Sequence, residues 1–172
     1  MATGIVSEFV TRAATPADAA IMTEIYNQGI ADRVATFQTE PRTPEQVVAW
    51  FDGRHPHVVV ERDGEVVAFA STSLYRSTPW YAGIAEFSVY VARSARGQGA
   101  GRTALMALMA AAESAGFWKL VSRVFVENTA SRRLMQSVGF REVGVYEKHS
   151  RLDGVWRDCI IVERLLGPAQ SA

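Results

Sequence analysis

The sequence predicts an α/β protein, in which helices cover one mixed β-sheet of the α+β type. Two observations lead to this class. Helical and strand-like periods succeed one another in the order β α α β β β α β α β β. Asp-Gly pairs at 63–64 and 153–154 join consecutive strand-like runs, as in tight hairpins. A chain of 172 residues suits one domain, so we expect residues 1–172 to form a single domain with a core over about 8–166.

The helices are expected from their start and stop signals. Thr15 and Thr43 stand where N-caps belong, and each is followed by a proline that suits the first helical position. Gly53, Gly116 and Gly139 stand where a glycine ends a helix. The expected helical ranges are 16–30, 43–53, 101–115 and 129–139.

The strands are expected where apolar and polar residues alternate or where β-branched residues gather. The expected ranges are 8–14, two strands within 57–75, then 84–92, 119–126, and two strands within 141–166. Both paired ranges contain one of the Asp-Gly turns, so each is expected to be an antiparallel hairpin.

Composition excludes several kinds of partner. The apolar fraction of 48% and the charged fraction of 21% are ordinary for a globular protein. With 18 basic and 18 acidic side chains, nothing favours nucleic acid or an anionic membrane as a partner. The single cysteine, Cys159, cannot form an internal disulfide, and no run approaches the ~18 apolar residues of a membrane span. We therefore expect a cytoplasmic protein.

The stretch "ARSARGQGAG", residues 92–101, lies between an expected strand and an expected helix. Glycine allows close approach of the backbone to a ligand, and the N-terminus of a helix attracts anions. A nucleotide phosphate loop is excluded because Arg102 and Thr103 follow the glycines, and the dinucleotide pattern fails because its third glycine would fall at Arg102. What remains is R-x-x-G-x-G, which predicts either a pyrophosphate site or a turn without a ligand.

R-x-x-G-x-G after "EFSVYV" and before a long helix resembles the acetyl-coenzyme A (acetyl-CoA) motif of the Gcn5-related N-acetyltransferases (GNAT). The segments "EIYNQGI", "ENTASRRLMQSVGF" and "LDGVWRD" look like the phosphinothricin acetyltransferase branch, which includes enzymes acting on methionine sulfoximine, methionine sulfone and arsinothricin. The resemblance covers roughly residues 8–166. It implies the GNAT fold, acetyl-CoA as co-substrate and a small amino acid analogue as acceptor.

The resemblance also implies a set of cofactor-binding residues. The strand before the loop would pair with the pantetheine arm through its main chain, and the loop would hold the pyrophosphate. The implied residues are Ser88, Val89, Tyr90, Val91, Arg96, Gly97, Gln98, Gly99, Ala100, Gly101, Arg102, Asn128 and Ser131. Asn128 equally suits a plain helix N-cap, so this alternative stays open.

Acetyl transfer to an amine needs a base, because amines are mostly protonated at neutral pH. Glu86 alternates with Ser88 and Tyr90 on one face of its strand, and the resemblance aligns it with the family's catalytic glutamate. A salt bridge with a surface arginine is the alternative, and direct and water-mediated proton transfer both stay open. Where many relatives have a Tyr or His to protonate the leaving thiolate, this chain has Met135, which puts a general acid in doubt.

The acceptor site is expected to contain a cationic side chain and aromatic side chains. A guanidinium binds a carboxylate, phosphinate or arsonate through two contacts, and the resemblance favours Arg76 for this role. The implied substrate-binding residues are Phe37, Tyr75, Arg76, Ser77, Ala85 and Glu86. Trp80 and Tyr81 are candidates for a homodimer contact. The histidines and Cys159 show no metal-ligand spacing, so no metal is expected.

These observations predict an N-acetyltransferase that moves an acetyl group to the α-amine of a glutamate- or methionine-like toxic analogue and so confers resistance. Two alternatives remain. One is a non-catalytic acyl-CoA-binding module, and the other is an acetyltransferase for another small amine. A polyamine, aminoglycoside or protein N-terminus would call for an acidic cleft, whereas Arg76 favours an anionic acceptor.

Overall fold

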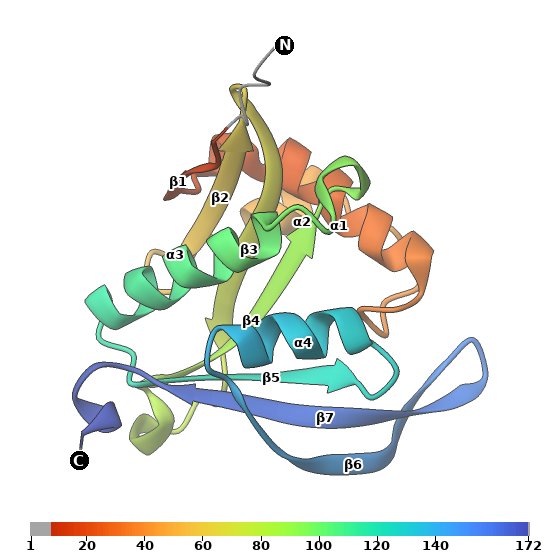
Figure 1. Cartoon of the computed structure of the whole chain (residues 1–172), viewed down its shortest axis with the longest axis vertical. Coiled ribbons are helices and arrows are strands. Elements are labelled where there is room, and N and C mark those ends of the chain that lie inside the picture. The colour runs from red at the N-terminus through yellow and green to blue at the C-terminus, as the bar shows by residue number, and fades with distance from the viewer. Residues whose placement is uncertain (1–7, 172) are drawn as a thin grey trace, which may run out of the picture.

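The computed structural model describes residues 8–171 of the chain. The strands are β1 (Val10–Ala13), β2 (His57–Arg62), β3 (Glu65–Leu74), β4 (Ile84–Val91), β5 (Lys119–Phe125), β6 (Arg141–Leu152) and β7 (Val155–Leu165). The α-helices are α1 (Ala19–Asp32), α2 (Pro44–Val48), α3 (Ala100–Ser114) and α4 (Thr129–Ser137). The strands form one seven-stranded sheet in the order β1-β2-β3-β4-β5-β7-β6 (Figure 1). Within residues 8–171, only β4 and β5 pair in parallel, which confirms the expected mixed sheet.

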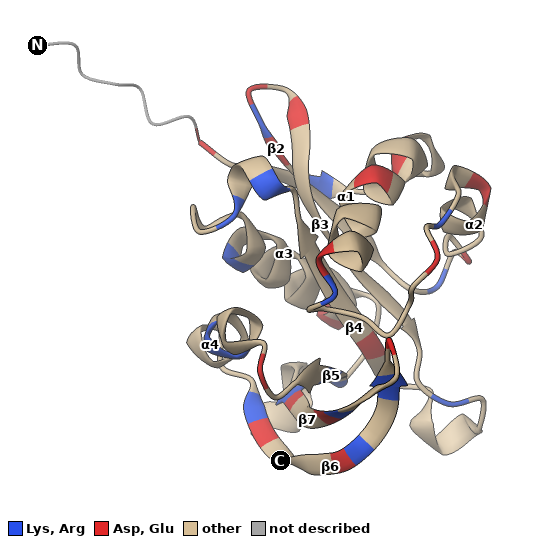
Figure 2. Ribbon diagram, turned by 90° about the vertical axis from the view of Figure 1, so that its right-hand side faces the viewer, with Lys and Arg blue, Asp and Glu red and all other residues tan. Residues whose placement is uncertain are grey.

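Helices cover both faces of the sheet. Figure 2 shows α3 and α4 on one side of the strands and α1 and α2 on the other. Leu105 and Leu108 of α3 are fully buried against the first face, and Met22 and Ile25 of α1 are buried against the second. Each such side chain contributes roughly 1.5–3 kcal/mol through burial, so both helices are held firmly on β2, β3 and β4.

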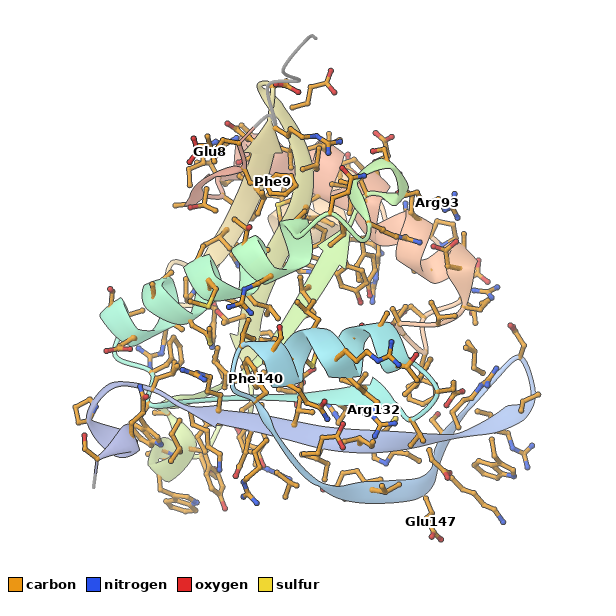
Figure 3. All side chains as sticks on the ribbon, in the orientation of Figure 1. Glu8, Phe9, Arg93, Arg132, Phe140 and Glu147 are labelled. Atoms are coloured by element: carbon orange, nitrogen blue, oxygen red, sulfur yellow. The ribbon has the colours of Figure 1, made fainter. Side chains whose placement is uncertain are left out.

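Two contacts fix α4 against the sheet, and both involve residues labelled in Figure 3. The ring of Phe140, just after α4, lies with its centroid 4.6 Å from that of Phe87 on β4. Within α4, Nε of Arg132 donates a hydrogen bond of 2.9 Å to the carboxylate of Glu142 on β6. These contacts hold the helix across the part of the sheet formed by β5, β7 and β6.

The start of the first helix and the end of the second differ most from the expected boundaries. The first helix begins with a 3-10 turn over Pro16–Asp18 and becomes α-helical only at Ala19. The second was expected over 43–53, but α2 ends at Val48 and Gly53 is not its stop. Just beyond the helix, Trp50 packs edge-on against Tyr26, with ring centroids 5.5 Å apart.

β4 and β5 separate soon after they meet. Their parallel pairing covers only Ile84–Glu86 opposite Lys119–Val121, whereas β4 pairs with β3 over Ala85–Val91. In Figure 1, β4 turns upward while β5 runs across the molecule beneath α4. Over residues 87–91 the β5-side edge of β4 therefore has no strand partner within the described chain. Such an edge offers free main-chain N–H and C=O groups to an extended ligand.

Among residues 8–171, no helix is both long enough and apolar enough to span a membrane.

Candidate active site

A cavity of about 380 Å³ lies where β4 and β5 separate. Its lining comes from β4, the glycine loop after it, the end of α1 and the start of α4. Ten of the predicted cofactor-binding residues line it: Val89, Tyr90, Val91, Arg96, Gly97, Gly99, Gly101, Arg102, Asn128 and Ser131. Residues from distant parts of the sequence thus meet in one cavity that the strand edge borders.

The glycine loop ends in the N-terminus of α3. Gly97 and Gly99 have φ of 72° and 96°, in the left-handed region that favours glycine. A Cβ on Gly99 would meet only a ring carbon of Phe9 at 3.9 Å, so the backbone conformation rather than lack of space requires glycine. The first turn of a helix leaves its N–H groups without intrahelical partners, and these groups suit an anion.

The side chain of Arg96 is already engaged within the protein. Its Nη1 lies 2.6 Å from Oδ2 of Asp32, and its Nε donates to the carbonyl of Val91 at 3.1 Å. Hydrogen bonds from Arg93 and then from Arg96 lower the pKa of Asp32. The positive charge of Arg96 is therefore shared with an ionised carboxylate, and backbone N–H groups are the freest donors that the loop offers.

Three predicted cofactor residues have side chains outside this cavity. Ser88 lines a different cavity of about 390 Å³, on the face of the sheet that α1 and α2 cover. The amide of Gln98 bonds to the carbonyl of Ser94 and to the guanidinium of Arg62. Ala100 is 1% exposed and belongs to the core beneath α3. Only main-chain groups of these three residues are available to a ligand in the first cavity.

Asn128 caps α4, as one of the two sequence interpretations proposed. Its Oδ1 accepts the N–H of Ser131 at 3.1 Å, and its Nδ2 donates to the carbonyl of Val34 at 3.0 Å. The second bond joins the start of α4 to the segment after α1. Asn128 also lines the cavity, so capping and ligand contact are compatible.

Glu86 lies on β4 at the point where β5 diverges. Nη2 of Arg123 on β5 donates to both of its carboxylate oxygens, at 2.9 and 3.0 Å. The side chain of Glu86 is 32% exposed and that of Arg123 is 46% exposed, so the pair faces an open space. The expected alternation holds along the strand, because Phe87 is buried beneath α3 whereas Tyr90 packs on Tyr26 with centroids 4.7 Å apart. The salt bridge considered as an alternative for Glu86 is thus present.

The predicted acceptor residues lie in three places: beside Phe125, in the loop between β3 and β4, and on β4 itself. Phe37 packs edge-on against Phe125, with centroids 4.8 Å apart, beside a cavity of about 420 Å³ that Arg123 also lines. Tyr75, Arg76 and Ser77 lie in the loop between β3 and β4, outside that cavity. There the guanidinium of Arg76 lies 5.3 Å from the ring centroid of Tyr75, and a hydrogen bond to Tyr75 raises the pKa of Arg76.

Ala85 is a predicted substrate residue whose side chain lies away from Glu86. It is 0% exposed, because neighbouring residues of a strand point to opposite faces and Ala85 points into the core beneath α3. Its side chain cannot contact a substrate on the face of Glu86.

Met135 is 4% exposed within the same core. It supplies no proton and lines none of the cavities described above. Within residues 8–171, no three His, Cys, Asp or Glu side chains gather in a way that could hold a metal ion.

Sequence reasoning missed Arg123. The alternation of "KLVSRVFV" places Arg123 on the same face of its strand as Phe125, and this was readable from the sequence. Its proximity to Glu86 depends on the parallel register of β4 and β5, in which Glu86 lies opposite Val121. No local pattern encodes that register, because the two strands are separated along the chain by all of α3.

The sequence profile of the acetyltransferase (GNAT) family matches residues 22–140. The chain belongs to this family. A phosphinothricin N-acetyltransferase of Streptomyces coelicolor is 32% identical over 167 residues, which cover 93% of this chain and 98% of that protein. An L-methionine sulfoximine/L-methionine sulfone acetyltransferase of Salmonella typhimurium is 31% identical over 156 residues, covering 88% of this chain and 91% of that protein.

A solved GNAT structure agrees with the architecture. It is a phosphinothricin acetyltransferase of Sinorhizobium meliloti in complex with acetyl-CoA, with a TM-score of 0.88 and 27% identity, covering 95% of this chain and 91% of that one. The expected GNAT fold and the expected class of N-acetyltransferase are confirmed.

Proposed function

We propose that this GNAT enzyme moves the acetyl group of acetyl-CoA to the α-amine of a toxic amino acid analogue, with Glu86 as general base. The observation that carries the proposal is the place of Glu86, the residue at which the free edge of β4 begins, in contact with Arg123, which lines the cavity beside Phe37. The non-catalytic alternative gives this carboxylate only its salt bridge with Arg123.

The first cavity suits acetyl-CoA as a co-substrate. The N–H groups at the start of α3 suit its pyrophosphate, and the free edge of β4 suits the amide groups of its pantetheine arm. The related enzyme from Sinorhizobium meliloti is itself in complex with acetyl-CoA. The thioester would then lie near Glu86, because β4 leads from the glycine loop back to that residue.

The reaction follows from these positions. Glu86 takes a proton from the acceptor's ammonium group, and the freed nitrogen attacks the thioester carbonyl carbon. Main-chain N–H groups along the free edge of β4 stabilise the oxyanion. The C–S bond then breaks and coenzyme A leaves as a thiolate, which takes up a proton from water. A thiol with a pKa near ~8.5 leaves without a dedicated acid, in keeping with the burial of Met135.

Two arginines support an anionic acceptor. Arg123 lines the cavity beside Phe37, and Arg76 stands exposed in the loop before β4. A polyamine or aminoglycoside would be repelled by both. The relatives named for phosphinothricin and for methionine sulfoximine act on molecules of the proposed class. Arsinothricin, which the sequence resemblance suggests, shares the acidic amino acid character, and acetylation of any of these compounds would confer resistance to it.

We further propose a homodimer. Trp80 and Tyr81 form a 3-10 turn with Pro79 between β3 and β4, and they are 69% and 37% exposed. Large aromatic side chains at such exposure are typical of contact surfaces.

Replacement of Glu86 tests the mechanism. Glu86→Gln keeps the size of the side chain but accepts no proton, so turnover is expected to fall roughly 10²-fold or more at neutral pH. Part of the loss should recover as pH rises, because more of the acceptor is then a free amine. The measurement is thiol release from acetyl-CoA with phosphinothricin and methionine sulfone as acceptors.

Glu142→Gln is the matched control. Glu142 is also a half-exposed glutamate paired with an arginine, but it lies on β6 beside α4. Near-normal turnover of Glu86→Gln across pH would refute the role of Glu86. If no amine of a broad panel elicits thiol release from the unaltered protein, the non-catalytic alternative holds instead.

A further inference from the structure

Arg123 has no role in the reaction steps proposed above, although it contacts the general base. Its guanidinium contacts Glu86 through a single nitrogen, Nη2. Among the described residues, Nε and Nη1 of Arg123 have no hydrogen-bond partner. A guanidinium has five N–H donors in a planar fork, so donors remain on the sides of Arg123 away from Glu86.

Arg123, with these free donors, lines the cavity of about 420 Å³ beside Phe37. Phe37 and Phe125 form one wall of this cavity, and Ser150, His149 and Cys159 contribute polar or polarisable atoms. Arg123 is the cationic residue of this lining. An anionic group of a ligand in this cavity would therefore bind Arg123, and the aromatic wall suits the methylene groups attached to it.

The contact between Arg123 and Glu86 indicates which anionic group of the acceptor binds Arg123. In an α-amino acid, the carboxylate and the amine are bonded to the same α-carbon. If Arg123 binds the α-carboxylate of the acceptor, the amine of the acceptor consequently lies next to Glu86, which Arg123 also binds. A phosphinate or sulfone at the far end of the side chain is several bonds away from the amine, and it would have to bind elsewhere.

We propose that Arg123 binds the α-carboxylate of the acceptor while it orients Glu86, and so makes the enzyme selective for free α-amino acids. The inference rests on the proposed function, and it adds the recognition of the α-carboxylate and the residue responsible. Arg123 touches the substrate in this proposal, whereas Arg76 is left to contact the distal acidic group. Amines without an α-carboxylate, and peptides in which it is an amide, are poor acceptors.

The test compares each acceptor with its α-carboxamide. Methionine sulfone and phosphinothricin are assayed beside their α-carboxamides, which keep the amine and the side chain but lose the charge that Arg123 binds. For Arg123→Ala, the KM of both free acids is expected to rise about 10- to 100-fold, as for the loss of a charged hydrogen-bond partner. The preference of the enzyme for acid over carboxamide should fall by the same factor, and the KM for acetyl-CoA should stay unchanged.

Three further variants separate this role from a structural one. Arg123→Lys keeps the charge but not the planar fork, so it should restore only part of the preference. Arg76→Ala should keep the preference for the α-carboxylate. Arg141→Ala is the matched control, because Arg141 also pairs with a glutamate on a neighbouring strand, Glu163 on β7. Thermal unfolding of each variant checks that it is folded.

The possible results distinguish a failure of the role of Arg123 from a failure of the proposed function. If the unaltered enzyme acetylates the free acids and Arg123→Ala keeps its preference over the carboxamides, the inference is wrong while the proposed function stands. If Arg76→Ala abolishes the preference and Arg123→Ala does not, Arg76 binds the α-carboxylate instead. If the unaltered enzyme acetylates none of these acceptors, the proposed function fails and the inference fails with it.

Discussion

Asp18 stabilises the start of α1, a helix that borders the site. Its two carboxylate oxygens each accept a hydrogen bond of 2.8 Å from the guanidinium of Arg12, and one of them also accepts the N–H of Thr15. The bonds from Arg12 lower the pKa of Asp18 to about 2, while burial opposes the shift. The pair joins β1 to the start of α1, whose other end borders the cavity of the glycine loop.

This pKa predicts acid sensitivity. The carboxylate has a lower pKa in the folded chain than the ordinary 3.8, so the unfolded chain takes up the proton first. The free energy of unfolding should therefore decline as pH falls from about 4 towards 2. Asp18→Asn should lose about 1–2 kcal/mol at pH 7, since Arg12 is partly exposed, and should show a flatter decline with acid. Urea unfolding at several pH values measures both effects.

Glu147→Gln is the control for this measurement, because Glu147 is an exposed carboxylate on β6. Its replacement should leave both the stability at pH 7 and the acid dependence nearly unchanged. If Asp18→Asn and Glu147→Gln behaved alike, the ion pair of Arg12 and Asp18 would contribute nothing to stability.

At the scale of elements, local sequence explained the strands better than the ends of the helices. Alternation along β4 correctly separated Glu86 from Phe87, because the side chains of a strand point to opposite faces whatever its neighbours are. The predicted end of α2 was wrong: the helix ends at Val48, and Trp50 beyond it packs against Tyr26, a tertiary contact that no local signal encodes. The resemblance named Ala85 as a substrate-binding residue, and the same alternation points its side chain into the core, so only its main chain is left for that role.

The junction of the glycine loop and α3 supports a prediction at this scale. Gly99→Ala should weaken acetyl-CoA binding about tenfold or more, because the strained backbone disturbs the N–H groups that suit the pyrophosphate. Gly116→Ala is the matched control. Gly116 follows the other end of α3, and its φ of 86° is as unfavourable for alanine as the 96° of Gly99. Both variants should lose roughly 1–2 kcal/mol of stability from strain.

Calorimetric titration with acetyl-CoA distinguishes the two positions. A loss of affinity confined to Gly99→Ala supports an anion site at the start of α3. Equal dissociation constants for the two folded variants would show that the loop is a turn without a ligand, the alternative that the sequence left open.

At the scale of the whole molecule, the site exists because β4 and β5 meet over three residues of each strand and then part. The pairing of these strands, and with it the contact between Glu86 and Arg123, is a property of the assembled sheet. The sequence resemblance implied the edge of β4 and the glycine loop through a known fold. It did not imply Arg123, because no quoted motif includes that residue.

The exposed aromatic loop before β4 leads to the last prediction. The rings of Trp80, Tyr81 and Tyr75 follow one another, with centroid distances of 6.3 Å from Trp80 to Tyr81 and 5.7 Å from Tyr81 to Tyr75. Tyr75 in turn contacts the guanidinium of Arg76. If a second copy of the chain covers this patch, dimerisation fixes the loop that carries Arg76, so acceptor binding depends on the dimer.

Trp80→Ser should therefore shift the protein from dimer to monomer in sedimentation experiments and raise the KM for phosphinothricin, with little effect on the KM for acetyl-CoA. Trp156→Ser is the control, since Trp156 is a 49% exposed tryptophan on β7 that stacks with Arg151. A dimer that persists in Trp80→Ser would place the interface elsewhere. An unaltered protein that sediments as a fully active monomer at every concentration would refute the dimer itself, and the exposed rings would then serve the acceptor alone.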